Sequence, residues 1–469
     1  MIINNLESVE NKDHLIIIIG SGPAGIASAL EFEKKRIECL VIEAGDQKEN
    51  IENLEFLKGK LVGENYNDLE TSRLRIFGGT GNLWGGNCNP MKIEDFEGWP
   101  ITFNDLNIYK EEAKKILNLK NDFFLEKYNK NLNLYNLDWS DVKFGKKYLN
   151  HIKRSKYIHL SLNTIFKSFN GEKGNIESIN CFKNKNYKLK SKYYILSCGG
   201  IENNRLLLWS KNENPKLFSY SLPIGNYYMD HPFNSVADGI INYKNFKSYN
   251  LSNNIKNAPL ITCNKSMFLS CNKNFINKNN ILNSGLYIGF IDNIDNNLYK
   301  QIRCVAPKFI KKIYEKNFVK KNYQITVEIL QEQKPLHNRK IALSKSLDPV
   351  GIPLPEVHWW KTNHERYSAR LITEEFGKIL LENEIGRIGL ENYLFTKEDY
   401  STTVGYHQLG GTRMGNNYKD SVVDKNLKVH GFKNLFINGS SVFTTGSHVH
   451  PTYTIVLLAT RLSNYISKL

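Results

Sequence analysis

The chain has 469 residues, 41% of them hydrophobic and 12% aromatic. This is enough apolar material for two or three folded domains, and it excludes a globally disordered protein. Lys and Arg outnumber Asp and Glu by 63 to 47, giving a net charge of +16 that could steer anionic partners. The chain has no compact Lys/Arg run of the kind that is typical of nucleic-acid binding, so no nucleic-acid partner is expected. The positive charge instead indicates a general compositional bias toward Lys and Asn.

The seven cysteines are scattered and include no C-x-x-C pair, so we expect no disulfide framework and a reducing, cytoplasmic compartment. The polar segment Met1 to His14 lacks the features of a secretory signal, and no apolar stretch is long enough to cross a bilayer. The run Lys308 to Tyr314, in a basic region at 308–321, is amphipathic, which is typical of a helix with one face exposed to solvent. Peripheral contact with a membrane or a partner is the alternative.

The N-terminal segment has the pattern of a βαβ unit. Leu15 to Ile19 is a short β-branched run that predicts a buried parallel strand, a helical pattern follows residues 20–25, and Glu38 to Ile42 predicts a second strand. The sequence G-S-G-P-A-G at residues 20–25 satisfies G-x-G-x-x-G in the strand-to-helix context that the motif requires. This context predicts a dinucleotide site.

In such a site each motif residue has a physical task. Gly20 permits the tight turn, Gly22 lets backbone N–H groups reach a pyrophosphate, and Gly25 lets helix and strand pack closely. Glu43, at the end of the second strand, can accept hydrogen bonds from a ribose diol and would repel the 2′-phosphate of NADP. The predicted contacts are Gly20, Gly22, Pro23, Ala24, Gly25 and Glu43. The motif alone leaves FAD and NAD open.

Further along the chain, residues 77–86 combine five glycines with Phe77 and Trp84. This composition predicts a buried backbone track against a flat ring rather than a mobile surface loop. Residues 102–119 have helical spacing and a Thr-x-x-Asp cap. The other predicted elements are strands at Tyr157–Phe169, Ile176–Phe182, Tyr187–Leu196 and Leu435–Ile437, helices at Glu202–Trp209, Glu365–Glu384 and Thr452–Ser467, and mixed strands and loops over 236–345.

Two segments near the C-terminus each carry a histidine beside glycines. His407 precedes a glycine turn and Arg413, in Y-H-Q-L-G-G-T-R-M-G at 406–415, and His450 directly precedes Pro451, which suits the first turn of a helix. The positive end of that helix would stabilise negative charge developing on a flavin beside it. A histidine in such a place can act as a base of near-neutral pKa.

These segments together resemble the glucose–methanol–choline (GMC) family of flavin oxidoreductases. The H-x-x-G-G-T-R-M-G form is most similar to the branch of sugar oxidases and sugar dehydrogenases. The segments that carry the resemblance, in the family's order, are 20–25 with Glu43, 77–86, 98–101 (G-W-P-I), 197–203 (S-C-G-G-I-E-N), 229–232 (M-D-H-P), 407–415 and 438–454. The resemblance extends over nearly the whole chain.

The resemblance implies an α/β fold class with a Rossmann-type FAD-binding domain interleaved with an α+β substrate domain built on an antiparallel sheet. The expected segments are 1–90, 145–235 and 402–469 for the FAD-binding domain, and 91–144 and 236–401 for the substrate-binding (cap) domain. A small alcohol or sugar would bind between them, where ligands of such proteins lie. The electron acceptor, oxygen or another compound, is not determined.

The resemblance also implies residue roles. The His407 position carries the base that takes the hydroxyl proton as hydride leaves for flavin N5. The His450 position, His or Asn in relatives, hydrogen-bonds the same substrate oxygen. The other cofactor contacts it implies are Gly79, Thr80, Asn82, Leu83, Gly439, Ser440, Pro451, Thr452 and Thr454. We interpret His430 and His448 as structural residues and His231 as a packing or turn residue. Arg413 is interpreted as a brace of its loop, with binding of an acidic substrate as the alternative. We predict no metal site.

Two departures from the family pattern bear on the cofactor. Some sugar oxidases of the family link FAD covalently through a His in the glycine loop, but that position is Leu83 here and the loop has no His, so non-covalent FAD is predicted. Many relatives carry Asp where this chain has Asn438, which weakens a charged contact near the flavin's ribityl or phosphate groups. In the cap domain, Trp359 and Trp360 have two interpretations: they stack on a sugar ring, or they belong to the hydrophobic core.

The leading prediction is therefore FAD-dependent oxidation of an alcohol group, on a sugar or polyol. The alternatives are a non-redox flavoprotein on the same scaffold, such as a lyase or a sugar mutase, and an FAD-binding protein without catalysis. The paired histidines favour oxidation. The sequence leaves the substrate open among polyols, free sugars, nucleotide-linked sugars and glycosides. It also does not determine which hydroxyl is oxidised or what the oligomeric state is.

Overall fold

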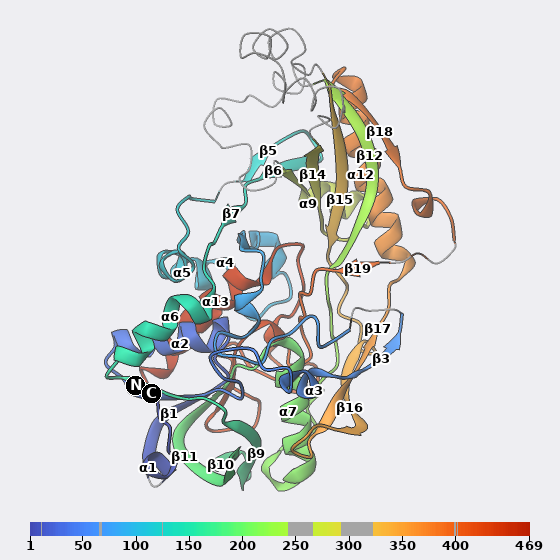
Figure 1. Cartoon of the computed structure of the whole chain (residues 1–469). Coiled ribbons are helices and arrows are strands. Elements are labelled where there is room, and N and C mark those ends of the chain that lie inside the picture. Colours follow the sequence, from blue (N-terminus) through green and yellow to red (C-terminus); the bar gives the residue numbers. More distant parts are fainter. Residues whose placement is uncertain are drawn as a thin grey trace, which may run out of the picture.

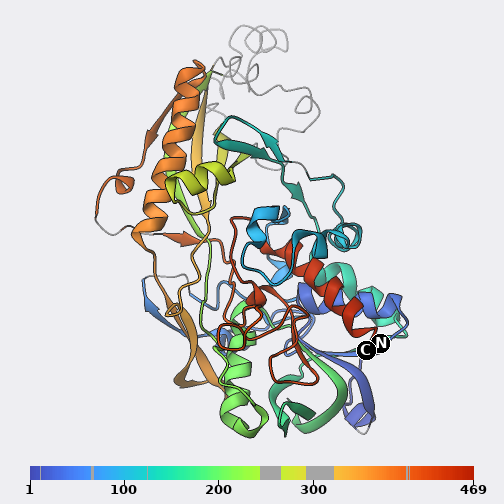
Figure 2. The same cartoon turned by 180° about the vertical axis from the view of Figure 1, so that it is seen from behind.

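The structure is a computed structural model that describes residues 1–10, 12–64, 68–123, 125–242, 266–291, 322–397, 400 and 402–469. The basic region at 308–321 lies outside the described residues, so its interpretation stays a prediction. The described part of the chain forms two large sheets with helices packed on them, and the two termini lie side by side (Figures 1 and 2).

The first sheet contains the predicted βαβ unit. Its parallel strands are β8 (Ile158–Ser161), β2 (Cys39–Ile42), β1 (Asp13–Ile19), β11 (Lys185–Leu196) and β20 (Leu435–Ile437), in that order. β2 and β20 are buried along their whole length, because helices cover the sheet and leave such strands no polar face. α2 (Pro23–Lys34) packs between α6 (Phe144–Arg154) and α13 (Pro451–Ile466) on this sheet (Figure 1).

The first half of β11 continues into an antiparallel meander with β10 (Asn175–Lys183) and β9 (Ile165–Glu172). The single strand predicted over Tyr157–Phe169 is wrong, because the chain forms β8 and β9 there. Asn163 lies between them in the left-handed region, with φ 52°, a conformation that Asn tolerates and that ends an extended strand.

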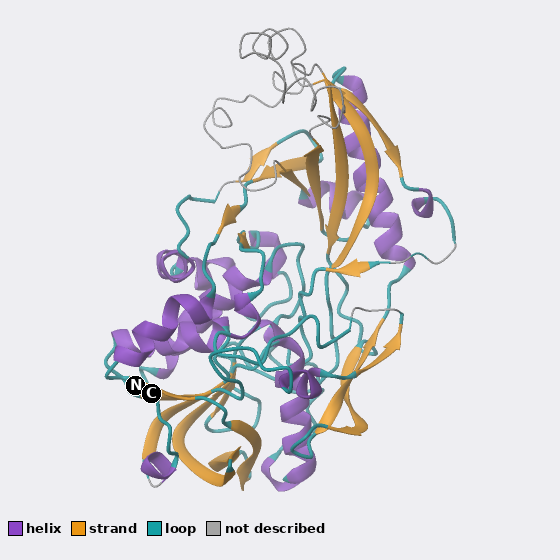
Figure 3. Cartoon of the chain, viewed as in Figure 1, coloured by secondary structure: helices purple, strands orange, loops and turns teal. Residues whose placement is uncertain are grey.

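The second sheet is antiparallel throughout, and one long helix packs on it. Its strands are β18 (Gly386–Leu390), β12 (Pro232–Asn242), β15 (Asn322–Gln331), β14 (Ser284–Ile291), β13 (Ser266–Cys271), β6 (Leu132–Tyr135) and β5 (Leu125–Lys127), with β19 (Thr403–Val404) beside β12. α12 (Asn363–Glu382) lies along this sheet (Figure 3). Ile372 and Phe376 of α12 are buried in one cluster with Val327 and Ile329 of β15, which joins helix and sheet.

Smaller elements connect the two sheets. β3 (Lys60–Gly63) pairs with β17 (Pro353–Trp359), which pairs with β16 (Lys340–Leu347), and β4 (Asn87–Cys88) pairs with β7 (Asp138–Trp139). The remaining helices are α1 (Glu7–Glu10), α3 (Asn53–Leu57), α4 (Phe103–Asn107), α5 (Lys110–Leu117), α7 (Gly200–Glu213) and α9 (Lys273–Asn279). The helix predicted over 102–119 is thus divided into α4 and α5, although Thr102 forms the predicted cap.

The predicted fold class, a mixed α/β protein with an antiparallel sheet, is confirmed. The boundaries of the two domains stay a prediction. The five described cysteines are all free. Within the described residues, no helix has both the length and the apolar composition that crossing a bilayer requires.

Candidate active site

The glycine motif forms the turn between β1 and α2. Gly20 has φ +98°, a conformation that glycine adopts without strain. Gly25 lies so close to the Gly20 carbonyl that any Cβ there would clash with it. A Cβ on Gly22, in contrast, would meet no atom of the described residues within 4 Å. The motif therefore makes the tight turn and the close packing that were predicted, and no atom of the described residues fills the space beside Gly22.

The surroundings of this turn fit a dinucleotide cofactor. Ser197, where β11 ends, has a buried hydroxyl with no hydrogen-bond partner among the described residues, and a Cβ on Gly199 would meet none of their atoms within 4 Å. Gly439, where β20 ends, has φ +118°, which favours glycine. These positions follow the carboxyl ends of parallel strands and adjoin the N-terminus of α2, where phosphates bind in such sheets.

Glu43 lies where the sequence predicts it, at the end of β2, and it also organises the turn. Its carboxylate accepts the Ser21 backbone N–H at 3.0 Å, the Ser21 hydroxyl at 2.6 Å and the Gly45 N–H at 2.8 Å. An ionised carboxylate has about four lone-pair sites. About one therefore remains for a ribose hydroxyl.

The glycine loop at 77–86 packs on this first turn. The Gly78 N–H donates to the Ser21 carbonyl at 3.1 Å, and a Cβ on Gly79 would lie 3.2 Å from Gly22 Cα. Asn82 donates to the Phe77 carbonyl at 2.8 Å and accepts the Gly145 N–H at 2.7 Å. Packing against the protein's own backbone thus accounts for part of the loop's glycine content. Cofactor contacts by Gly79, Thr80, Asn82 and the exposed Leu83 stay predictions.

The two predicted histidines come together. His407 follows β19 in a loop, and His450 is the residue before Pro451 at the N-terminus of α13. Their ring centroids are 5.0 Å apart at an interplanar angle of 79°, and both side chains are only half-buried. Tyr287 of β14 places its hydroxyl 3.3 Å from His450 Nε2. The second sheet therefore contributes a polar group beside the pair.

His231, interpreted from the sequence as a packing or turn residue, is in contact with this pair. Its Nδ1 lies 2.9 Å from His407 Nδ1, and its Nε2 lies 3.1 Å from the Gly446 carbonyl oxygen. Oδ1 of the buried Asp230 accepts the backbone N–H of His231 at 2.7 Å and that of His407 at 2.8 Å. The M-D-H-P segment, an acid and a histidine directly before a strand, was the sequence signal for this contact.

Burial keeps all three imidazoles neutral. It lowers the pKa of His231 to about 4 and that of His450 to about 3, and it lowers the pKa of His407 well below its ordinary value. The neighbouring His231 and His450 rings depress the His407 pKa further. At neutral pH each ring therefore has one nitrogen able to accept a proton.

Two further polar residues line this region and were missed by sequence reasoning. Asn89 accepts the His450 backbone N–H at 3.3 Å, and its buried amide nitrogen has no partner among the described residues. Glu332 accepts the Ser447 N–H at 3.1 Å, and burial raises its pKa to about 7. Neither residue belongs to a recognisable motif, so only the folded chain indicates them.

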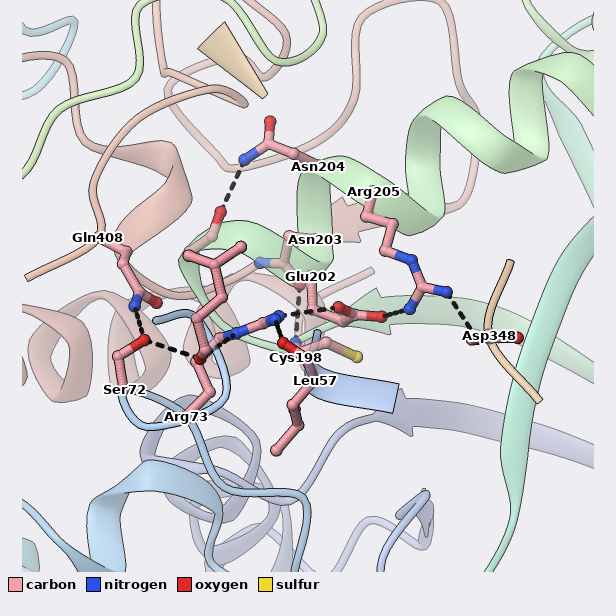
Figure 4. Close-up of polar contacts among 12 residues, drawn as sticks. Leu57, Ser72, Arg73, Cys198, Glu202, Asn203, Asn204, Arg205, Asp348 and Gln408 are labelled. Carbon is pink, nitrogen blue, oxygen red and sulfur yellow. Dashed lines mark hydrogen bonds and ion pairs between the residues drawn. The ribbon is translucent and has the colours of Figure 1, made fainter. Parts of the chain in front are cut away.

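Polar contacts hold the segment that follows His407, and Figure 4 shows the contact of Gln408 with Ser72 among them. Gln408 donates to the Ser72 hydroxyl at 3.1 Å, and Asn204 of α7 donates to the Gly410 carbonyl at 3.2 Å. Arg205, the next residue of α7, donates to Glu202 at 2.5 Å and to Asp348 at 2.6 Å. These contacts fix the glycine turn of the 406–415 segment to α7.

The other residues singled out in the sequence have structural surroundings. His448 is fully buried, with its ring centroid 5.6 Å from that of Phe268. Arg413 lies over the Tyr227 ring at 4.3 Å. Trp359 is a core residue whose indole donates to Gln333 at 2.8 Å.

The residues near the C-terminus that are predicted to contact the cofactor lie on two elements. Gly439 and Ser440 follow β20, and Pro451, Thr452 and Thr454 lie in the first turn of α13. Asn438 donates to the Ser28 hydroxyl of α2 at 3.1 Å, so it links two elements of the cofactor region. Among the described residues, no group of three or more His, Cys, Asp or Glu side chains is arranged to hold a metal ion.

Known proteins resemble the chain in sequence and in fold. Residues 337–459 match the family model described as GMC oxidoreductase. The chain is 26% identical over 291 residues to a 2-methyl-1,2-propanediol dehydrogenase of Mycolicibacterium austroafricanum, and 26% identical over 287 residues to the fructose dehydrogenase large subunit of Gluconobacter japonicus. The matched part is 60% of this chain in both cases and 49% and 48% of the relatives, so the chain spans about half the length of the curated relatives it matches.

The fold is similar to that of a solved flavoenzyme over almost the whole chain. A pyridoxine 4-oxidase from Mesorbium loti superposes with a TM-score of 0.62, over 97% of this chain and all of the other, at 14% sequence identity. At that identity the likeness concerns the fold alone. The C-terminal part of the chain, residues 337–459, is thus similar to GMC oxidoreductases, and the two dehydrogenases and the solved oxidase are similar to the chain in sequence and in fold, respectively.

Proposed function

We propose that the protein is an FAD-dependent oxidoreductase that oxidises an alcohol group of a sugar or polyol, with His407 as the base for the hydroxyl proton. The observation that carries the proposal is the approach of two half-buried, neutral imidazoles, His407 and His450, to 5.0 Å. FAD, when bound, supplies the acceptor for the hydride that leaves the alcohol carbon. An alcohol gives up hydride readily only as its O–H proton is removed, so a neutral imidazole facing that oxygen meets the chemical need.

His450 has a separate task in this proposal. It lies where α13 begins, and its ring can hydrogen-bond the same substrate oxygen and hold it toward His407. Tyr287, 3.3 Å from the His450 ring, would fix the orientation of that ring. A substrate held by two groups reacts faster because the reacting atoms are already oriented.

The cofactor assignment rests on the turn at residues 20–25, on Glu43 and on the space beside Gly22 that no described residue fills. We propose that FAD is held without a covalent bond, since Leu83 occupies the position that a linking histidine has in some relatives. Denaturing the purified protein should release all of its flavin into solution as FAD. Flavin that stays with the precipitated protein would contradict this assignment.

The substrate class is proposed from chemistry shared by the relatives, a diol dehydrogenase and a fructose dehydrogenase. Purified holoenzyme should be mixed anaerobically with 2-methyl-1,2-propanediol, D-fructose and a panel of polyols and free sugars. Loss of the visible flavin absorption together with one carbonyl product per flavin is expected. A protein that binds FAD but is reduced by no alcohol would instead be a non-redox flavoprotein, such as a lyase or mutase, or a binding protein. Reoxidation in air then separates an oxidase from a dehydrogenase.

A further inference from the structure

His231 connects His407 to a backbone carbonyl, and this connection determines where the protons lie. The Gly446 carbonyl oxygen, 3.1 Å from His231 Nε2, can only accept a hydrogen bond. Nε2 therefore carries a hydrogen, because otherwise two lone pairs would face each other. His231 is fully buried, and burial lowers its pKa to about 4, so the ring is neutral at neutral pH. Its Nδ1 then has a lone pair.

The same reasoning extends to His407. Two nitrogens at 2.9 Å share one proton, and His231 Nδ1 is the acceptor. The proton consequently belongs to His407 Nδ1, and the lone pair of a neutral His407 is on Nε2. Nε2 is on the opposite side of the ring from His231.

The backbone around His407 holds its ring in this orientation. Tyr406 has φ 55°, an uncommon conformation for a residue other than glycine. A Cβ on Gly405 would lie 2.8 Å from His407 Nδ1, so only glycine leaves room for the ring. The Gly405 N–H donates to the His231 carbonyl at 2.8 Å. Both histidines are thus parts of one braced turn.

We propose that His231 is a positioning residue that holds His407 in its Nδ1–H tautomer, so that Nε2 faces the substrate and receives the hydroxyl proton. The inference rests on the proposed function for the identity of the proton donor. In the step, the substrate O–H bond breaks and an N–H bond forms at His407 Nε2. The resulting imidazolium keeps donating through Nδ1 to neutral His231, which stabilises its charge. His231 acts through His407 and touches no substrate in this scheme.

Histidine tautomers are measurable without turnover. The holoenzyme, labelled with 15N-histidine, should be studied by long-range proton–nitrogen NMR, with His407 and His231 assigned through the variants His407→Gln and His231→Asn. We expect the proton of His407 on Nδ1 and that of His231 on Nε2. A wild-type His407 that carries its proton on Nε2 would overturn the inference. Because no alcohol is needed, this measurement decides the inference even if the proposed function fails.

Kinetics provide the second arm. His231→Leu keeps the approximate volume but has no acceptor, whereas His231→Asn keeps an amide oxygen near the position of Nδ1. With whichever of D-fructose and 2-methyl-1,2-propanediol reduces the wild-type flavin, His231→Leu should slow reduction at least tenfold, with a change in kcat larger than the change in KM. His231→Asn should recover part of the rate. A folded His231→Leu protein with wild-type reduction and an unchanged His407 tautomer would refute the role, and if this variant does not fold, the NMR result decides.

Discussion

At the scale of single residues, the site depends on imidazoles that stay uncharged because burial disfavours the charged form. His407 contacts both His450 and His231. A proton on any one of the three rings would lower the proton affinity of the other two. A second proton on the group is therefore disfavoured, and in the proposed function the substrate hydroxyl supplies the first. At neutral pH the three rings are uncharged, and the cluster is unsuited to hold several protons.

The role of His407 leads to a test at the same scale. His407→Ala should slow flavin reduction by about two orders of magnitude, the contribution of a positioned base, while bound FAD stays unchanged. Stopped-flow absorbance under anaerobic conditions measures the reduction rate. The control is His430→Gln, because His430 contacts Ser421 at 3.0 Å and lies in no proposed catalytic contact. Equal rates in His407→Ala and the wild type would remove His407 from the role of base.

At the scale of elements, two glycines in the turn between β1 and α2 have different roles. Gly25 is needed for the fold, since the helix there touches the carbonyl of Gly20, whereas Gly22 faces space that no described atom fills. Gly22 also has φ −69°, which alanine adopts easily. The two positions can therefore be distinguished experimentally.

Gly22→Ala should leave the thermal stability of the apoprotein nearly unchanged and weaken FAD binding at least tenfold, because the new methyl group occupies the space proposed for the pyrophosphate. Gly25→Ala should destabilise the apoprotein itself, because helix and strand must move apart. Apoprotein melting temperatures and FAD titrations distinguish the two effects. Full FAD affinity in Gly22→Ala would show that the cofactor does not approach this residue.

A buried ion pair joins two further elements. Arg205 of α7 contacts Asp348 in the connection between β16 and β17, and both side chains are almost completely buried. Asp348→Ala should lower the free energy of unfolding by about 3 kcal/mol, because it leaves a buried guanidinium with one carboxylate fewer. The exposed pair of Arg370 and Glu374 is the matched control, and Glu374→Ala should change stability by less than about 1 kcal/mol. Similar values from chemical denaturation of the two variants would contradict this expectation.

At the scale of the whole molecule, the site forms where the two sheets meet. His450 begins a helix that packs on the first sheet, His231 directly precedes β12 of the second, and Tyr287 lies on β14 of the second. The imidazole cluster is therefore assembled only when both sheets are in place. Its protonation state becomes a property of the folded molecule as a whole.

The cluster predicts a dependence of stability on pH. In the unfolded chain a histidine has a pKa of about 6.5, whereas the pKa of His450 in the folded protein is lowered to about 3. At pH values between about 3 and about 6.5 the unfolded chain binds more protons than the folded protein does. The contribution of His450 to the free energy of unfolding is therefore complete above about pH 6.5 and is lost as the pH falls toward about 3. The raised pKa of Glu332 contributes with the opposite sign between its ordinary value and about 7, so a variant must isolate the histidine term.

His450→Asn removes one titrating group. Lowering the pH from about 6 to about 5 should reduce the free energy of unfolding less in this variant than in the wild type. The difference between the two reductions should be about 1 kcal/mol. Denaturant unfolding with FAD in excess at each pH measures the difference. Parallel pH profiles would mean that the His450 pKa is not depressed in the folded protein.

The sequence by itself determined the features that depend on neighbours in the chain. Four features were predictable: the strand–turn–helix at residues 13–34, Glu43 at the end of β2, the helix that begins at Pro451, and the candidate pair His407 and His450. Strand and helix patterns, glycine turns and caps are local properties. Nothing local, however, marked the break at Asn163 between β8 and β9, since the residues on both sides favour extended structure.

Only the tertiary structure decided which side chains meet. His231 and His407 are 176 residues apart and share a hydrogen bond, and Asn82 bonds to a residue of α6 rather than standing free for a ligand. Such contacts depend on how strands from different sheets are joined and on the backbone conformation of single turns, such as those at Gly405 and Tyr406. The sequence therefore determined the chemical groups of the site, while long-range packing decided their orientation, because a hydrogen bond requires distances and angles that no local pattern encodes.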